Sequence, residues 1–116
     1  MTYSVTEAFV AWLAGKGYAA STRPPKSGDE FVTVERVGGL VADMVDHPAM
    51  AVQTWARTET RAEEMANAIR LALVGGDVPR GVHRASVDSG PYAYFDEDTR
   101  LPRYQLSLDC TAQLAD

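Results

Sequence analysis

Cysteine and histidine are scarce in this chain of 116 residues, which holds Cys110 as its one cysteine and two histidines, His47 and His83. A single thiol cannot close a disulfide within the chain, so nothing in the sequence indicates an oxidising compartment. A metal site needs several ligands at defined spacing, and neither histidine has such ligands around it in the sequence. The sequence therefore predicts no internal disulfide and no bound metal.

Long apolar runs are missing too. Every apolar run is far shorter than the roughly 20 residues that a membrane-spanning helix needs. The first residues, MTYSVTEAFVAWLAG, carry Glu7 and no basic leader, unlike a secretory signal peptide. We therefore expect a protein without membrane contact that is made and folded in the cytoplasm.

Basic residues are outnumbered, because 11 lysines and arginines stand against 16 aspartates and glutamates, for a formal net charge of −5. An acidic surface repels phosphate, which argues against a protein that holds nucleic acid in a basic groove. The small basic group of Arg80, His83 and Arg84 is too thin to predict DNA binding. The same repulsion suits the wall of a channel through which DNA slides without sticking.

The motifs of well-known chemistries are also missing from the sequence. The pairs Gly38-Gly39 and Gly75-Gly76 match neither the GxxxxGKS/T nor the GxGxxG phosphate-binding pattern, and no serine stands in a GxSxG turn. The acidic residues 96–98 lack an EF-hand pattern around them. We therefore expect no enzyme and no cofactor. One alternative of another class stays open, a small enzyme or ligand-binding domain that uses His47, His83 or Cys110.

The chain does contain enough apolar material for a single packed domain over residues 1–116, since 46% of its residues are hydrophobic. A helix is expected from about Ser4 to Ala14. A second helix is expected from Thr60, where Glu63 stands at capping-box spacing, to the pair Gly75-Gly76. Each helix has an apolar stripe at helical spacing, which predicts that one side of it is buried.

Several segments have the composition or the alternation of strands, and the last of them is the clearest. They are residues 18–20, Phe31–Val37, Ala49–Arg57, Val82–Ser89 and Arg103–Gln113. Residues 38–48 are interpreted as an excursion between strands. This order predicts an α+β fold, a single mixed or antiparallel β-sheet packed against two α-helices. The strands before and after the second helix are candidates for a β-α-β unit.

Protein contact is the function that the remaining candidate residues favour. They are apolar or aromatic side chains outside the expected core, together with uncharged polar residues on the polar side of the last strand. These residues are Leu40, Val41, Met44, Trp55, Tyr92, Tyr94, Gln105 and Ser107. Trp55 allows two interpretations of equal weight, because it can anchor a partner or pack under a helix.

Five features follow one another along most of the chain. They are an amphipathic N-terminal helix, VERVGG (34–39), TRAEEMANAIRLAL (60–73), GPY (90–92) and PRYQLSLDCTA (102–112). In this order and spacing they resemble the tail-terminator proteins of long-tailed phages of actinobacteria. No single feature carries the resemblance alone.

The resemblance implies a structural virion protein with no catalytic residues, made in the host cytoplasm and placed at the head-proximal end of the tail. Such a protein forms a hexameric ring that caps the tail tube, ends tube polymerisation and offers a surface for head–tail joining. Its partners are then other copies of itself, the tail tube protein and a head-completion or stopper protein. DNA would pass through the ring without sequence-specific binding.

A ring requires two different patches of each subunit to meet. We expect these patches to be the 38–48 excursion and the sheet edge near the Arg103–Gln113 strand. Another head–tail connector, neck or tail-completion protein fits the same features. Gene order discriminates between the two, because a terminator gene typically lies directly before the tail tube gene.

Overall fold

The computed structural model describes residues 3–94 and 101–115, which form two helices and five strands. The helices are α1 (Val5–Gly15) and α2 (Glu59–Val74). The strands are β1 (Ala20–Ser21), β2 (Phe31–Ala42), β3 (Val45–Trp55), β4 (Val82–Ala93) and β5 (Arg103–Ala112). Of these two helices, neither has the length and the apolar character needed to cross a membrane.

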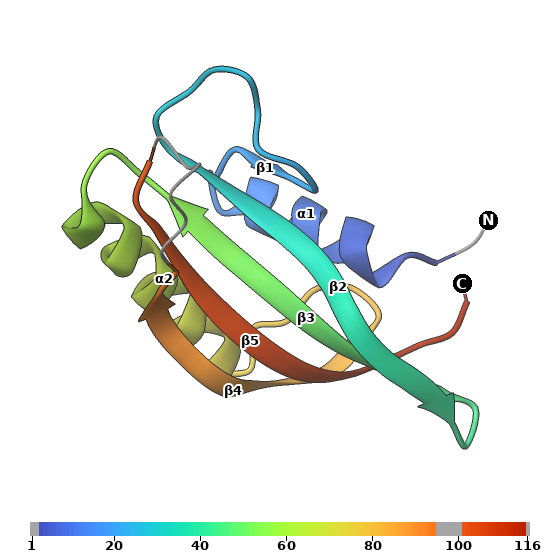
Figure 1. Cartoon of the computed structure of the whole chain (residues 1–116). Coiled ribbons are helices and arrows are strands. Elements are labelled where there is room, and N and C mark those ends of the chain that lie inside the picture. The colour runs from blue at the N-terminus through green and yellow to red at the C-terminus, as the bar shows by residue number, and fades with distance from the viewer. Residues whose placement is uncertain (1–2, 95–100, 116) are drawn as a thin grey trace.

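All five strands belong to one sheet, in the order β1-β2-β3-β5-β4. Only the short β1–β2 pairing is parallel, and the other pairings are antiparallel, so the sheet is mixed. Both helices lie on the same face of this sheet (Figure 1). The predicted α+β fold, one sheet packed against two helices, is therefore confirmed.

Both helices begin at a threonine or serine cap. The Ser4 hydroxyl accepts a hydrogen bond from the backbone N–H of Glu7, as the capping-box spacing predicted. The second cap is Thr58 rather than Thr60, since the Thr58 hydroxyl accepts from the N–H of Arg61. The prediction was wrong by two residues because it required an acidic partner at the third helical position, and a cap works without one.

The hydrophobic core fills the space between the helices and the sheet. Side chains that alternate along β2, β3 and β5 point toward the helices and meet the apolar stripes of α1 and α2. The largest of the fully buried side chains are Phe9, Leu13, Met50, Met65, Ile69 and Leu106. The opposite face of the sheet has no covering helix or strand among the described residues.

Residues 38–48 are not an excursion, which corrects the prediction made for them. β2 continues to Ala42 and β3 begins at Val45, so the two strands form one long hairpin. Asp43 and Met44 make its turn, with φ angles of 55° and 65°. Two positive φ angles characterise the tight turn that matches strand twist, but sequence analysis recognises this turn mainly from Asn-Gly or Asp-Gly.

The strand Arg103–Ala112 is not an edge, which is a second correction. β5 lies between β3 and β4 and pairs with both. β3 and β4 therefore run parallel to each other but do not pair, so the expected β-α-β unit around α2 is split by β5. β4 also continues past Ser89, where the expected strand ended, through Gly90 to Ala93 with shifts of register.

The core assignment of α2 predicts opposite results at two neighbouring positions. Ile69 is 1% exposed, whereas Leu71, two residues further on, is 63% exposed. Replacing Ile69 with aspartate buries an unpaired charge and should lower the free energy of unfolding by about 3–5 kcal/mol. Leu71→Asp, the matched control, should change it by less than about 0.5 kcal/mol. A urea titration of both variants checks this, and equal effects would mean that the buried face of α2 is misassigned.

Candidate protein-binding surfaces

The end of the β2–β3 hairpin forms an arm, defined here as residues 37–44. The arm follows a shift of register between Arg36 and Gly38, which is typical of a β-bulge. On the outer side of β2, the short strand β1 pairs only with Val32 and Thr33. Beyond Thr33 no other described strand lines this side, so the outer edge of the arm is unpaired among the described residues.

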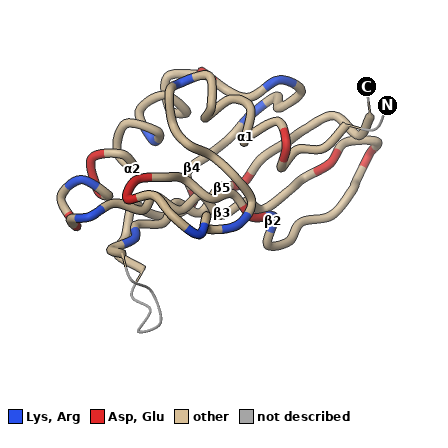
Figure 2. The backbone as a smooth tube through the Cα atoms, turned by 90° about the horizontal axis from the view of Figure 1, so that it is seen from above, with Lys and Arg blue, Asp and Glu red and all other residues tan. Residues whose placement is uncertain are grey.

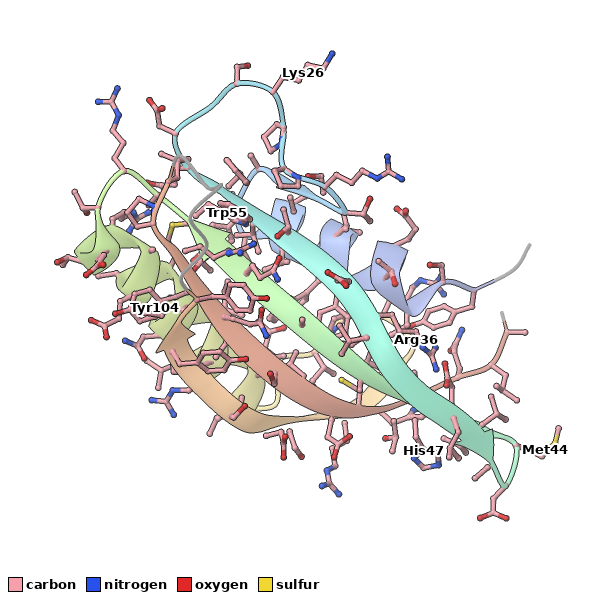
Figure 3. All side chains as sticks on the ribbon, viewed as in Figure 1. Lys26, Arg36, Met44, His47, Trp55 and Tyr104 are labelled. Atoms are coloured by element: carbon pink, nitrogen blue, oxygen red, sulfur yellow. The ribbon has the colours of Figure 1, made fainter. Side chains whose placement is uncertain are left out.

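Apolar side chains gather on the arm and face solvent. They are Val37, Leu40, Val41 and Met44. Met44 is 83% exposed and lies at the end of the hairpin, away from the body of the protein (Figure 3). A cluster of exposed aliphatic side chains on a projecting element is typical of a protein-contact surface.

The backbone at the arm's turn is held in a conformation that L-residues avoid. Met44 has a φ of 65°, and a residue other than glycine in the left-handed region costs roughly 1–2 kcal/mol. Glycine at this position would remove that cost and the exposed side chain together. The chain therefore keeps an apolar side chain at the tip at the expense of local stability, a combination found at functional positions.

Close contact between the β2 residues of the arm and the facing residues of β3 explains why position 39 is a glycine. Its φ is 100°, and a Cβ built on it would lie 2.0 Å from the backbone oxygen of His47. No side chain fits in that space, so only glycine lets the strands pair here. The pair Gly38-Gly39 therefore belongs to the construction of the arm rather than to a phosphate site.

An ion pair, called the clamp below, joins Arg36 at the base of the arm to Asp46, which pairs with Val41 near the turn. Both terminal nitrogens of Arg36 donate to the Asp46 carboxylate, with N–O distances of 2.7 and 2.8 Å, and Arg36 Nε donates to the carbonyl of Gly38. The hydrogen bonds from Arg36 hold the pKa of the mostly buried Asp46 carboxyl below its ordinary value. The clamp joins β2 on one side of the arm to β3 on the other, and so restrains the arm's direction.

The face of the sheet opposite the helices, called the open face below, carries a chain of hydrogen bonds between uncharged side chains. Trp55 Nε1 donates to Thr33 Oγ1, which donates to Gln53 Oε1. Gln53 Nε2 donates to Gln105 Oε1, and Gln105 Nε2 donates to the Tyr92 hydroxyl, which lies 3.2 Å from Ser107 Oγ. The chain crosses β2, β3, β5 and β4 and fixes side chains that would otherwise be mobile on the surface.

A stack of rings and one guanidinium lies at one end of the open face. The rings of Phe31 and Trp55 are stacked with centroids 5.3 Å apart. The Arg103 guanidinium lies over the Trp55 ring at 4.5 Å and over the Tyr94 ring at 4.1 Å. Trp55 is only 6% exposed as a result, so it supports Arg103 and offers little surface of its own.

The structure separates the predicted interface residues into two groups. Leu40, Val41 and Met44 belong to the arm. Trp55, Tyr92, Tyr94, Gln105 and Ser107 come together at the open face, where all but Trp55 keep partly or largely exposed side chains. Trp55 does not pack under a helix, because it lies on the face opposite the helices and is buried there beneath Arg103, and its role as an anchor for a partner stays a prediction.

The sequence analysis missed a third apolar surface, on the solvent side of α2. We call it the outer stripe and define it as Ala68, Leu71 and Val74, which are exposed and spaced by three residues. The signal was present in the sequence, because residues 68–74 are apolar all round the helix except for Arg70. The sequence prediction placed only the buried stripe of this helix, so the outer stripe was not predicted.

The residues proposed for an enzyme or ligand site do not form one constellation. His47 and Cys110 line a shallow depression of about 270 Å³ together with Arg84, Asp109 and Thr111. Burial, with a smaller effect from Asp109, raises the pKa of the Cys110 thiol to about 12, so the thiol is protonated at neutral pH. His83 is not part of this lining.

Metal ligands do not cluster in the described part of the chain, where no three His, Cys, Asp or Glu side chains are arranged to hold an ion. The acidic residues 96–98 lie outside the described residues. Charged positions of both signs are interspersed along the described backbone, and the basic ones do not gather on one face (Figure 2). These residues therefore form no basic patch of the kind that binds nucleic acid.

Comparison with known proteins adds no relative to these observations. No protein-family model matches the chain, and no curated protein matches it.

The strained turn predicts that one substitution stabilises the free protein. Met44→Gly removes the left-handed strain and should raise the free energy of unfolding by about 0.5–1 kcal/mol, after the entropic cost of glycine. Met44→Ala keeps the strain and should leave stability nearly unchanged. Chemical denaturation of the three proteins measures the effect, and a destabilised glycine variant would show that the turn differs from the one described.

The clamp predicts a pH dependence. The pKa of Asp46 is lower in the folded protein, so its contribution is present above the unfolded value of about 4 and disappears as pH falls through the folded pKa. Asp46→Asn should therefore cost about 1–2 kcal/mol at neutral pH, a figure reduced by the partial exposure of Arg36, and progressively less in acid. Unfolding measured from pH 7 to 3 checks this, with Asp88→Asn, at an exposed position of β4, as the control. A pH-independent difference would exclude the ion pair as the cause.

Proposed function

We propose that the protein is a structural assembly subunit, a phage tail terminator that forms a hexameric ring at the head-proximal end of the tail tube. The observation that carries the proposal is the arm, with its exposed aliphatic side chains, its strained turn and the ion pair between Arg36 and Asp46 that restrains it. An element with these properties stabilises the isolated subunit little, and it is suited to contact with another protein.

The open face supports a role in binding rather than in chemistry. Its central side chains are uncharged, and their hydrogen bonds to one another hold them in place before any partner arrives. A surface ordered in advance loses less conformational entropy on binding than a mobile one. An ordered and mainly uncharged face suits the surface of another folded protein, such as a tail tube or stopper subunit.

The edges of the sheet supply further contact sites for a ring. β4 pairs with β5 on its inner side only, and β2 is unpaired on its outer side beyond Thr33, among the described residues. Free edges carry N–H and C=O groups that a neighbouring subunit can satisfy. Because β5 is interior, the edge that we assign to the neighbour is β4. The two edges lie on opposite sides of the subunit, as a ring requires.

The acidic balance fits a ring that DNA traverses. Each copy contributes a formal charge of −5, so a hexamer would repel phosphate strongly and would not retain the passing DNA. Sequence-specific readout of DNA is not part of the proposal.

Deleting the gene from the phage that encodes this chain tests the proposal. Tails of uncontrolled length that fail to join heads are expected in electron micrographs, because nothing then stops tube polymerisation. Complementation with the wild-type gene should restore tails of normal length, and Met44→Asp should not, whereas Lys26→Asp, in an exposed loop, should.

The deletion also separates the alternatives. Normal-length tails that stay detached from heads would favour a neck or tail-completion protein. Normal-length tails joined to heads would rule out both of these functions and would return attention to the depression that holds His47 and Cys110.

A further inference from the structure

Exposed aliphatic side chains of large size occur at two places in the described residues, apart from Leu114 near the C-terminus. One place is the arm, with Val37, Leu40, Val41 and Met44. The other is the outer stripe of α2, where Leu71 is 63% and Val74 66% exposed. Both are exposed in the same subunit, so neither covers the other within one chain.

The two surfaces belong to opposite halves of the molecule. The arm extends from β2 and β3, on the side of the sheet where α1 packs. α2 packs mainly on β4 and β5, so the outer stripe belongs to the β4 side (Figure 1). Two different patches on opposite halves are what a head-to-tail, ring-closing contact requires, whereas a two-fold dimer would need one self-complementary patch.

One charged residue beside each surface has the sign opposite to that of the other, while the acidic Glu64 and Asp77 near the stripe are paired with Arg61 and Lys16. Asp43 stands next to Met44 in the turn of the arm and is exposed. Arg70 precedes Leu71 on α2 and makes no ion pair with another described residue. An arm lying along the outer stripe could place this acidic group near this basic one, which would orient the contact.

From these observations we propose that the arm of one subunit packs on the outer stripe of α2 in the next copy of the same chain. The inference rests on the proposed ring and names the receptor for the arm within it. Apolar contact between Met44 and the pair Leu71 and Val74 provides the attraction, and Asp43 with Arg70 sets the orientation. The two apolar surfaces that each subunit leaves in water are thereby buried together.

Disulfide trapping in purified protein tests the contact. The native Cys110 is 4% exposed and its thiol is protonated, so it gives little background. Met44→Cys and Val74→Cys variants, distinguished by a size tag, are mixed under mild oxidation at concentrations where sedimentation shows the wild type to be oligomeric. A covalent dimer of one variant with the other is expected in the mixture, at least tenfold above the yield of Met44→Cys mixed with Lys26→Cys.

Several results would overturn the inference. They are a Met44→Cys disulfide formed mainly with itself, equal trapping by the Lys26→Cys control, and a wild type that stays monomeric at every concentration. Adding Leu71→Asp to the Val74→Cys variant should abolish trapping while leaving the fold intact, because it places a charge in the contact. Unchanged trapping in that variant would also contradict the proposal.

Charge reversal tests the orientation separately. Asp43→Arg and Arg70→Asp should each reduce the association constant several-fold, and the two changes in one chain should restore it at low salt. If the double variant does not restore association, the proposed pairing between Asp43 and Arg70 is ruled out.

These measurements do not depend on the phage. If disulfide trapping joins the arm to α2 but the gene deletion leaves tails normal, the proposed self-contact stands and the terminator function is ruled out. If the gene deletion gives overlong tails but no disulfide joins the arm to α2 in the oligomer, the terminator function stands and the arm contacts another partner.

Discussion

One-sided burial is the constraint on which the rest of this structure depends. Both helices pack on the same face of the sheet, so Phe9, Met65 and Ile69 meet the strands from one direction only. The opposite face must therefore be tolerable in water, and hydrogen bonds between uncharged side chains meet that requirement. In a strand with one face on the core and one face toward solvent, buried and exposed side chains alternate, and β5 shows this alternation over most of its length.

The arm departs from this arrangement, because it extends past the part of the sheet that the helices cover. Its β2 residues have no helix beneath them, so Val37, Leu40 and Val41 stay exposed, although the facing strand β3 still pairs with β5 as far as Asp46. The clamp between Arg36 and Asp46 and the close approach at Gly39 hold β2 against β3 in this region. The arm is thus ordered without being buried, and this combination supports its assignment to contact with another molecule.

Sequence patterns over a few neighbouring residues predicted the helices and the last strand, because these elements depend mainly on local capping and alternation. Capping residues and apolar stripes placed both helices within two residues, and alternation placed the strand that begins at Arg103. The order of strands depends on pairing between distant segments, so no local pattern could place β5 inside the sheet. The arm was missed because glycines interrupt its alternation and its turn is Asp43-Met44. The candidate residues were chosen by type and not by contact, so their division into two surfaces required the structure.

The hydrogen-bonded chain across the open face has a direction. From Trp55 through Thr33, Gln53 and Gln105 to the Tyr92 hydroxyl, each group donates to the next. The links first run from β3 to β2 and back, and then cross from β3 to β5 and β4, where the two amide dipoles point the same way. The Thr33 and Tyr92 hydroxyls can each donate or accept, but reversing one glutamine amide alone would set two donors or two acceptors against each other between Gln53 and Gln105. The two amides must therefore hold or reverse together, so a molecule that rests near Tyr92 meets a hydrogen-bonding pattern set jointly by Gln53 and Gln105.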